Sequence, residues 1–149
     1  MSRTINRKIG AVSVLCMAMM AFALVMPLLC YGDEYPLEAD FSPKIINIES
    51  NRSGEIRVLT NLSYATFIAE GDSIFIYFND GSDSVPNIHA TRDSLGHLIL
   101  RFTLEDLLAV QSDLQIDGFN NAMVVVVMRS GDEYIGSDGE VYIVDKVAP

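Results

Sequence analysis

Apolar and polar residues alternate along much of residues 44–149, in short runs that turn-forming residues separate. In residues 55–60, for example, Ile56 and Val58 face one way while Glu55 and Arg57 face the other. A period of two residues is typical of a β-strand with one buried face. The pattern predicts up to nine short strands, at residues 45–48, 55–60, 66–69, 73–78, 87–91, 98–102, 122–128, 133–135 and 141–144.

The most strongly apolar of these runs is residues 122–128, which holds four consecutive valines between two methionines. In a strand, Val124 and Val126 share one face and Val125 lies on the other. A charge that is buried without a partner must be desolvated at high cost. We therefore expect an aspartate at Val124 or Val126 to differ markedly in its effect from one at Val125.

One segment breaks the period of two. Leu104, Leu107 and Leu108 are spaced i, i+3 and i+4, which places them on one face of a short helix over residues 104–110. Thr103 and Asp106 fit an N-cap with an acidic first turn. Many short strands with one helical crossover predict an antiparallel β-sandwich, one end of which this helix would close.

The first 32 residues have the anatomy of a secretory signal. Arg3, Arg7 and Lys8 form a basic start, an apolar run follows over residues 9–29, and the small Gly32 precedes an abrupt change to acidic residues. This order of charge, apolar run and small exit residue is that of an exported precursor. We expect cleavage after Gly32 and a secreted or periplasmic product.

Two alternatives to cleavage remain for this segment. The apolar run has about 20 residues, which is long enough to span a bilayer as a retained helix. Lipid attachment at Cys30 is the other alternative, although Pro27, Leu28 and Leu29 are not the small residues that usually precede a lipidated cysteine. Contact with a membrane is expected only under one of these two alternatives.

Charge and cysteine content limit what the exported part can do. Residues 33–149 carry seven of the 10 basic residues and all 20 acidic ones, for a formal net charge of −13. Such a surface repels phosphate backbones, so we expect no nucleic-acid partner. Both cysteines, Cys16 and Cys30, lie within the first 32 residues, so a hydrophobic core rather than disulfides must hold the domain together.

The chain is thus expected to comprise three parts: a signal at residues 1–32, a linker at 33–43 and a single domain at 44–149. The linker assignment depends on the poor patterning of residues 33–43 and on their two prolines, Pro36 and Pro43. The domain is of ordinary size and can bury an adequate core.

The order of motifs in the domain carries a resemblance to a known family. The residues concerned are 43–48, 72–74, 98–102 running into 104–108, 124–127, 131–133 and 136–138 before 141–144. In this order they resemble a family of immunoglobulin-like β-sandwich modules of bacterial extracellular proteins, often found beside dockerin-type or calcium-repeat segments. The resemblance implies an all-β fold, an antiparallel immunoglobulin-like β-sandwich with one short crossover helix, that acts as a spacer or binding module.

The chain departs from that family where many members have an Asp- and Gly-rich stretch resembling a calcium loop. Residues 92–97 stand there instead, with Asp93 as the only acidic residue, and Glu140 is an extra residue before the last strand. Elsewhere, Asp80 and Asp83 flank a turn and are the first candidates for weak calcium binding, since calcium prefers carboxylate oxygens in a tight loop. No cofactor is expected.

Catalytic chemistry has little support. His89 and His97 are the only histidines, too few for a zinc site without carboxylates, and no Gly-x-Ser-x-Gly motif is present. We therefore expect no enzyme, and no catalytic residue is assigned. The expected function is that of a secreted, acidic module with a structural or protein-interaction role at the cell envelope or exterior, whose partner is a protein or an envelope component.

The alternative is a carbohydrate-binding module, which would offer exposed aromatic rings. The chain has no tryptophan. Four of its aromatic residues, Phe75, Tyr77, Phe78 and Phe102, are expected mostly in the core because they lie in predicted strands. The residues left as possible sugar-binding rings on the surface are Tyr64, Phe67, Phe119 and Tyr134.

Overall fold

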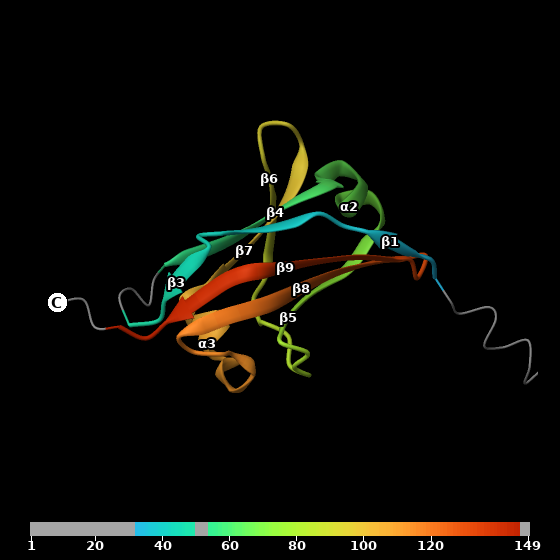
Figure 1. Cartoon of the computed structure of the whole chain (residues 1–149). Helices are drawn as coiled ribbons and strands as arrows, with labels where there is room; N and C mark the ends of the chain where they lie inside the picture. Colours follow the sequence, from blue (N-terminus) through green and yellow to red (C-terminus); the bar gives the residue numbers. More distant parts are fainter. Residues whose placement is uncertain (1–31, 50–53, 147–149) are drawn as a thin grey trace, which may run out of the picture. The chain divides into compact units, whose positions relative to one another are not determined.

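The computed structural model describes residues 32–49 and 54–146 (Figure 1). The chain divides into two compact units, residues 1–32 and residues 33–149, and the second contains almost all of the described part. The predicted signal segment lies outside the described residues except for Gly32, after which cleavage is expected. In the part that is described, no helix is long and apolar enough to span a membrane.

The second unit is built mainly of strands. They are β1 (Glu34–Pro36), β2 (Ala39–Ser42), β3 (Ile45–Asn47), β4 (Glu55–Ser63), β5 (Gly71–Phe78), β6 (His89–Arg92), β7 (His97–Thr103), β8 (Gly118–Met128) and β9 (Glu133–Val144). Two short α-helices, α2 (Tyr64–Glu70) and α3 (Leu104–Leu108), and a 3₁₀ turn at Gln111–Asp113 lie between them.

The strands form two sheets, which Figure 1 shows. Sheet A has the order β1-β9-β8-β5, with β3 also paired to β9, and sheet B has the order β2-β4-β7-β6. The pairings are antiparallel except those of β1 and β3 with β9, which are parallel. The predicted all-β sandwich, with its pairing mainly antiparallel, is thus confirmed.

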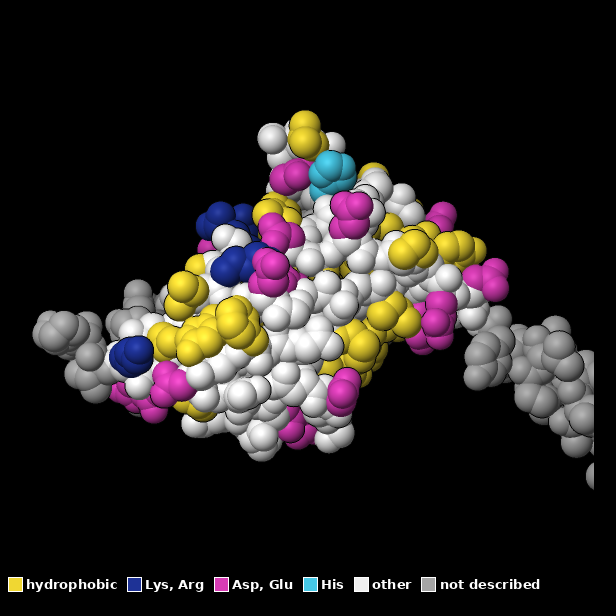
Figure 2. All heavy atoms as spheres, in the orientation of Figure 1, with side chains coloured by type: hydrophobic (Ala, Val, Ile, Leu, Met, Phe, Trp, Pro, Cys, Tyr) yellow, Lys and Arg dark blue, Asp and Glu magenta, His cyan; other side chains and the backbone are white. Residues whose placement is uncertain are grey.

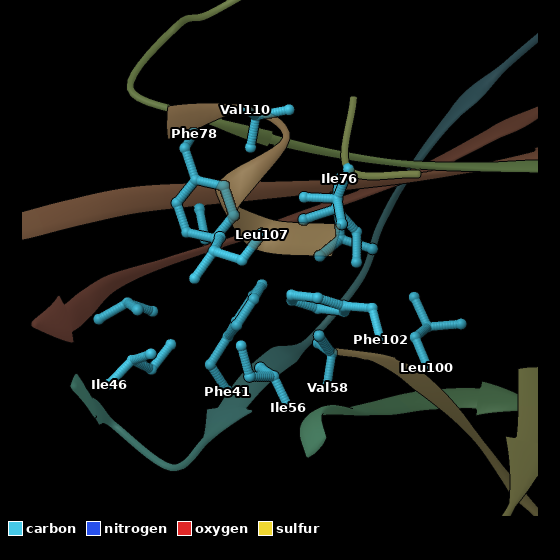
Figure 3. Packing of buried hydrophobic residues seen from close by; sticks show 14 of the residues in the cluster. Phe41, Ile46, Ile56, Val58, Ile76, Phe78, Leu100, Phe102, Leu107 and Val110 are labelled. Atoms are coloured by element: carbon cyan, nitrogen blue, oxygen red, sulfur yellow. The ribbon is translucent and has the colours of Figure 1, made fainter. Parts of the chain in front are cut away.

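The core lies between the two sheets and follows the predicted alternation. Val124 and Val126 of β8 are fully buried, as are Val58 of β4 and Leu100 of β7, whereas Val125 is half-buried on the opposite face. The ring of Phe41 from β2 packs edge-on against Phe78 and Phe102, with centroids 6.0 and 6.4 Å apart. Large side chains from both sheets therefore meet in one continuous core (Figure 3).

Helix α3 confirms the helical turn that leucine spacing predicted. Its N-cap is Thr103, whose Oγ1 accepts from the backbone N–H of Asp106, while the Asp106 carboxylate accepts in return from the backbone N–H of Thr103. This capping box satisfies donors that the first turn leaves free. Leu107 is fully buried and lies beside Phe78 and Val110 in Figure 3, so the helix covers part of the core.

The linker predicted at residues 33–43 is wrong. Strand β1 pairs with β9, and strand β2 pairs with β4, so this segment contributes to both sheets. Leu37 and Phe41 are buried in the core. Pro36 ends β1 and Pro43 follows β2, positions where a missing N–H removes no ladder hydrogen bond, so the two prolines are compatible with strands.

The strand predicted at residues 66–69 is also wrong, because helix α2 occupies residues 64–70. Ser63 is its N-cap and accepts from the N–H of Thr66 through its hydroxyl. Tyr64 and Phe67, three residues apart, pack together against the core. The short apolar run has the composition of a strand, but the capping serine and this spacing favour the helix.

Candidate functional site

The outer face of sheet A is apolar along most of its length. Cross-strand register places Phe75 of β5, Val125 of β8 and Ile135 of β9 in one row. Tyr77 and Met123 form the neighbouring row on the same face. Phe75 is 36% exposed, and the other four side chains are half-buried with no second layer described above them.

Further apolar side chains lie at the end of the sheet where β3 joins β9, and on β8 the exposed Asn121 separates them from Met123. Ile45, Tyr142 and Phe119 lie opposite one another there on three neighbouring strands. Ile45 is 65% and Phe119 is 64% exposed, and the rings of Phe119 and Tyr142 meet edge-on with centroids 4.9 Å apart. Lys44 and Glu140 border a shallow pocket over these side chains.

We call these eight side chains the apolar stripe: Ile45, Phe75, Tyr77, Phe119, Met123, Val125, Ile135 and Tyr142. Figure 2 shows an elongated hydrophobic patch over the ends of β3, β8 and β9, and a second patch near β5 and β8. The outer face of an antiparallel sheet is usually polar. Apolar patches left open on one face in this way are typical of a site that binds another molecule.

The stripe has little polar chemistry of its own. Asn121 and Ser137 are exposed beside it, and Glu133 and Glu140 lie at its borders. The Tyr142 hydroxyl donates to the backbone oxygen of Asp117 at 2.9 Å, which holds the ring in place. Such an arrangement suits shape-dependent apolar contact.

Two stripe residues correct the expectation from sequence. Phe75 and Tyr77 were expected in the core, but they face outward with their ring planes 16° apart and their centroids 6.1 Å apart. Their neighbours Ile76 and Phe78 are fully buried. Since side chains alternate along a strand, Phe75 and Tyr77 must face away from the core when Ile76 and Phe78 face into it.

The other aromatic candidates are divided between surface and core. Phe119 is exposed as expected, while Tyr64 and Phe67 pack against the core from helix α2. Tyr134 is half-buried and stacks on Tyr35, with centroids 5.1 Å apart. Phe119 is therefore the one of these four that joins the apolar stripe.

Asp80 and Asp83, the calcium candidates, are both exposed in the turn that follows β5. The structure brings Asp113 to the same turn, where its carboxylate would collide with a Cβ added at Gly81. Nevertheless, within residues 32–49 and 54–146 no group of three or more His, Cys, Asp or Glu side chains could hold a metal ion. Calcium binding by Asp80 and Asp83 stays a prediction.

The two histidines lie at opposite ends of the β6–β7 hairpin. His97 Nδ1 is 3.2 Å from Asp93 Oδ2. The backbone N–H of His97 donates to Asp93, as does that of Leu95, and these bonds together with the His97 ring hold the pKa of Asp93 below its usual value despite some burial. Asp93 thus organises the hairpin turn.

No protein-family model matches this chain, and no curated protein matches it either. The resemblance to immunoglobulin-like modules of bacterial extracellular proteins stays a prediction. The surfaces of the sandwich itself are therefore what indicates its function.

Proposed function

We propose that this protein is a secreted, non-catalytic, acidic β-sandwich module that binds a partner protein at the cell envelope or exterior. The observation that carries the proposal is the apolar stripe on the outer face of sheet A. Eight side chains from four strands form it, and residues from both sheets pack the core independently of it. The resemblance to extracellular binding modules supports the same function.

The charge of the domain defines the kind of partner. Residues 33–149 carry a formal net charge of −13, so two copies of the domain repel each other. A different protein with an apolar patch bordered by basic residues fits better, because its charges would complement Glu133 and Glu140 beside the stripe.

Site-specific photo-crosslinking in the producing cells tests this proposal. A photoreactive residue at Phe119 or Val125 should capture the same partner protein, whereas one at the exposed Ile68 of helix α2 should not. Phe75→Ser should abolish capture at both stripe positions while leaving the melting temperature of the domain nearly unchanged. Equal capture at Ile68, or capture of only a second copy, would contradict the proposal.

A carbohydrate-binding module is the second candidate, and the nearly parallel rings of Phe75 and Tyr77 favour it. Aromatic side chains present apolar faces that suit the C–H groups of sugars. Titration with soluble oligosaccharides separates the two candidate functions. Saturable binding that is lost in Phe75→Ala would favour the carbohydrate-binding module over the protein-binding one.

A further inference from the structure

The outer face of sheet B differs from that of sheet A because it brings two arginines together. Arg57 of β4 lies directly opposite Arg101 of β7, with Ser42 and His89 at the two ends of the same row. Like charges that face each other across a sheet destabilise it. In a domain with only seven basic residues against 20 acidic ones, this pairing is a concentrated positive site.

One carboxylate bridges the two arginines. Glu55 Oε2 is 3.2 Å from Arg57 Nη2, and Glu55 Oε1 is 3.0 Å from Arg101 Nη1. A guanidinium has five N–H donors, so Glu55 leaves most donors of both groups without a carboxylate. The side chain of Arg57 is 51% exposed and that of Arg101 is 35% exposed, and Arg101 Nε has no hydrogen-bond partner among the described residues.

The next row on the same face is apolar. Leu59 lies opposite Ile99, two residues along the strands from Arg57 and Arg101. Leu59 is 40% exposed, and Ile99, although buried, does not belong to the core cluster between the sheets. The four side chains form a block with a basic row and an aliphatic row, about 7 Å apart along the strands.

We propose that this block is a second interaction surface, which binds an extended segment of a partner protein with one carboxylate and one aliphatic side chain two residues apart. Alternate residues of an extended chain lie about 7 Å apart on one side, which matches the distance between the rows. Arginine pairs bind carboxylates with charge-assisted, often bidentate hydrogen bonds. A polyanion is a poor ligand, because the −13 domain repels it beyond the block.

Titration with a short model peptide tests the proposal on the exported domain. The peptide is a threonine-based pentapeptide with glutamate at its second position and leucine at its fourth, and its control has glutamine in place of glutamate. NMR of the arginine Nε–H groups and of the Leu59 and Ile99 methyl groups reports the site directly. We expect saturable shifts with the glutamate peptide and none with its control, at equal ionic strength.

Variants show whether the arginines act on the ligand or only on Glu55. Arg57→Gln should weaken peptide binding about two- to five-fold, the range for an exposed ion pair. Glu55→Gln should strengthen it by a similar factor, because it removes the competing carboxylate. Arg92→Gln, at the exposed end of β6, is the matched control and should change nothing.

Three results would overturn the proposal. They are the absence of saturation, equal shifts with inorganic sulfate at matched ionic strength, and weaker binding in Glu55→Gln. Absence of saturation, or weaker binding in Glu55→Gln, would mean that the arginines only hold Glu55 in place. Equal shifts with sulfate would mean that the block is a general anion site. Because the block and the apolar stripe lie on opposite faces, none of these results bears on the stripe.

Discussion

At the scale of single residues, Asp138 connects three parts of the sandwich. It belongs to β9 and points inward, with its side chain only 4% exposed. Its carboxylate accepts hydrogen bonds from the backbone N–H groups of Phe41 and Glu140, both at 2.9 Å, and from Lys44 Nζ. It therefore connects β2 of sheet B, and Lys44 before β3, to β9 of sheet A, whereas no backbone ladder joins β2 to β9 among the described strands.

Asp138→Asn should lower the free energy of unfolding by about 1.5–3 kcal/mol, the usual contribution of hydrogen bonds to a charged group. The matched control is Asp40→Asn, which removes the exposed partner of Lys44 and should cost no more than about 1 kcal/mol. Urea unfolding at pH 7 measures both. Equal losses in the two variants would show that the burial of Asp138 adds nothing.

The cost of Asp138→Asn also depends on pH. Burial raises the pKa of Asp138, but the hydrogen bonds from Lys44, Phe41 and Glu140 together hold it below its usual value. The folded protein thus releases this proton more readily than the unfolded chain. The difference between wild type and variant should be complete above about pH 4 and should shrink as the pH falls through the folded-state pKa.

The contribution of Lys44 to stability has the opposite pH dependence: it is lost as the pH rises. Its hydrogen bonds to Asp138 and Asp40 raise its pKa, although burial opposes them. This contribution is complete below about pH 10.4 and is lost as the pH rises through the raised pKa.

At the scale of elements, strand β8 shows how one apolar run serves two faces. Val124 and Val126 are fully buried between the sheets, while Val125 and Met123 belong to the apolar stripe. Every residue from 122 to 128 is apolar, so composition alone does not distinguish the two faces.

The two faces should respond differently to charge. Val124→Asp and Val126→Asp should each destabilise the domain by about 3–5 kcal/mol, since each places an unpaired charge in the core. Val125→Asp should cost about 1 kcal/mol, because its carboxylate reaches water. Thermal unfolding of the three variants checks this, and equal losses at all three positions would mean that the outer face of β8 is covered.

At the scale of the whole molecule, the excess of acidic residues determines how the domain responds to ions. Carboxylates are spread over much of the face shown in Figure 2, and basic side chains occupy only a few small areas. A net charge of −13 makes the compact state repel itself, and salt screens that repulsion. Stability should therefore rise modestly with sodium chloride.

Calcium should add little beyond this screening. We expect nearly the same melting temperature in chelator and in about 1 mM calcium, because calcium requires six to eight oxygens and the described residues hold no group of three or more His, Cys, Asp or Glu side chains placed to bind a metal ion. Magnesium at equal ionic strength is the control. A rise of many degrees with calcium alone would reveal a tight native-state site through ligand linkage.

Local pattern by itself determined the elements whose signal lies within a few consecutive residues. Alternation placed Ile56 and Val58 on the inward face of β4, and leucine spacing with the Thr103 cap defined helix α3. These features depend on the period of the backbone and on hydrogen bonds between near neighbours, which are the same in any fold. They were sufficient to predict the all-β sandwich.

Only the tertiary structure decided which apolar face is covered and which strands are neighbours. Phe41 enters the core because β2 pairs with β4, although its own segment resembles a linker. Phe75 remains outside the core because none of the described residues packs over the outer face of sheet A. Its local sequence pattern would be the same if that face were covered. The pairing of Arg57 with Arg101 depends on the register of two strands that are distant in sequence. The register between such strands is determined by the packing of the whole sandwich, so local periodicity in the sequence cannot predict it.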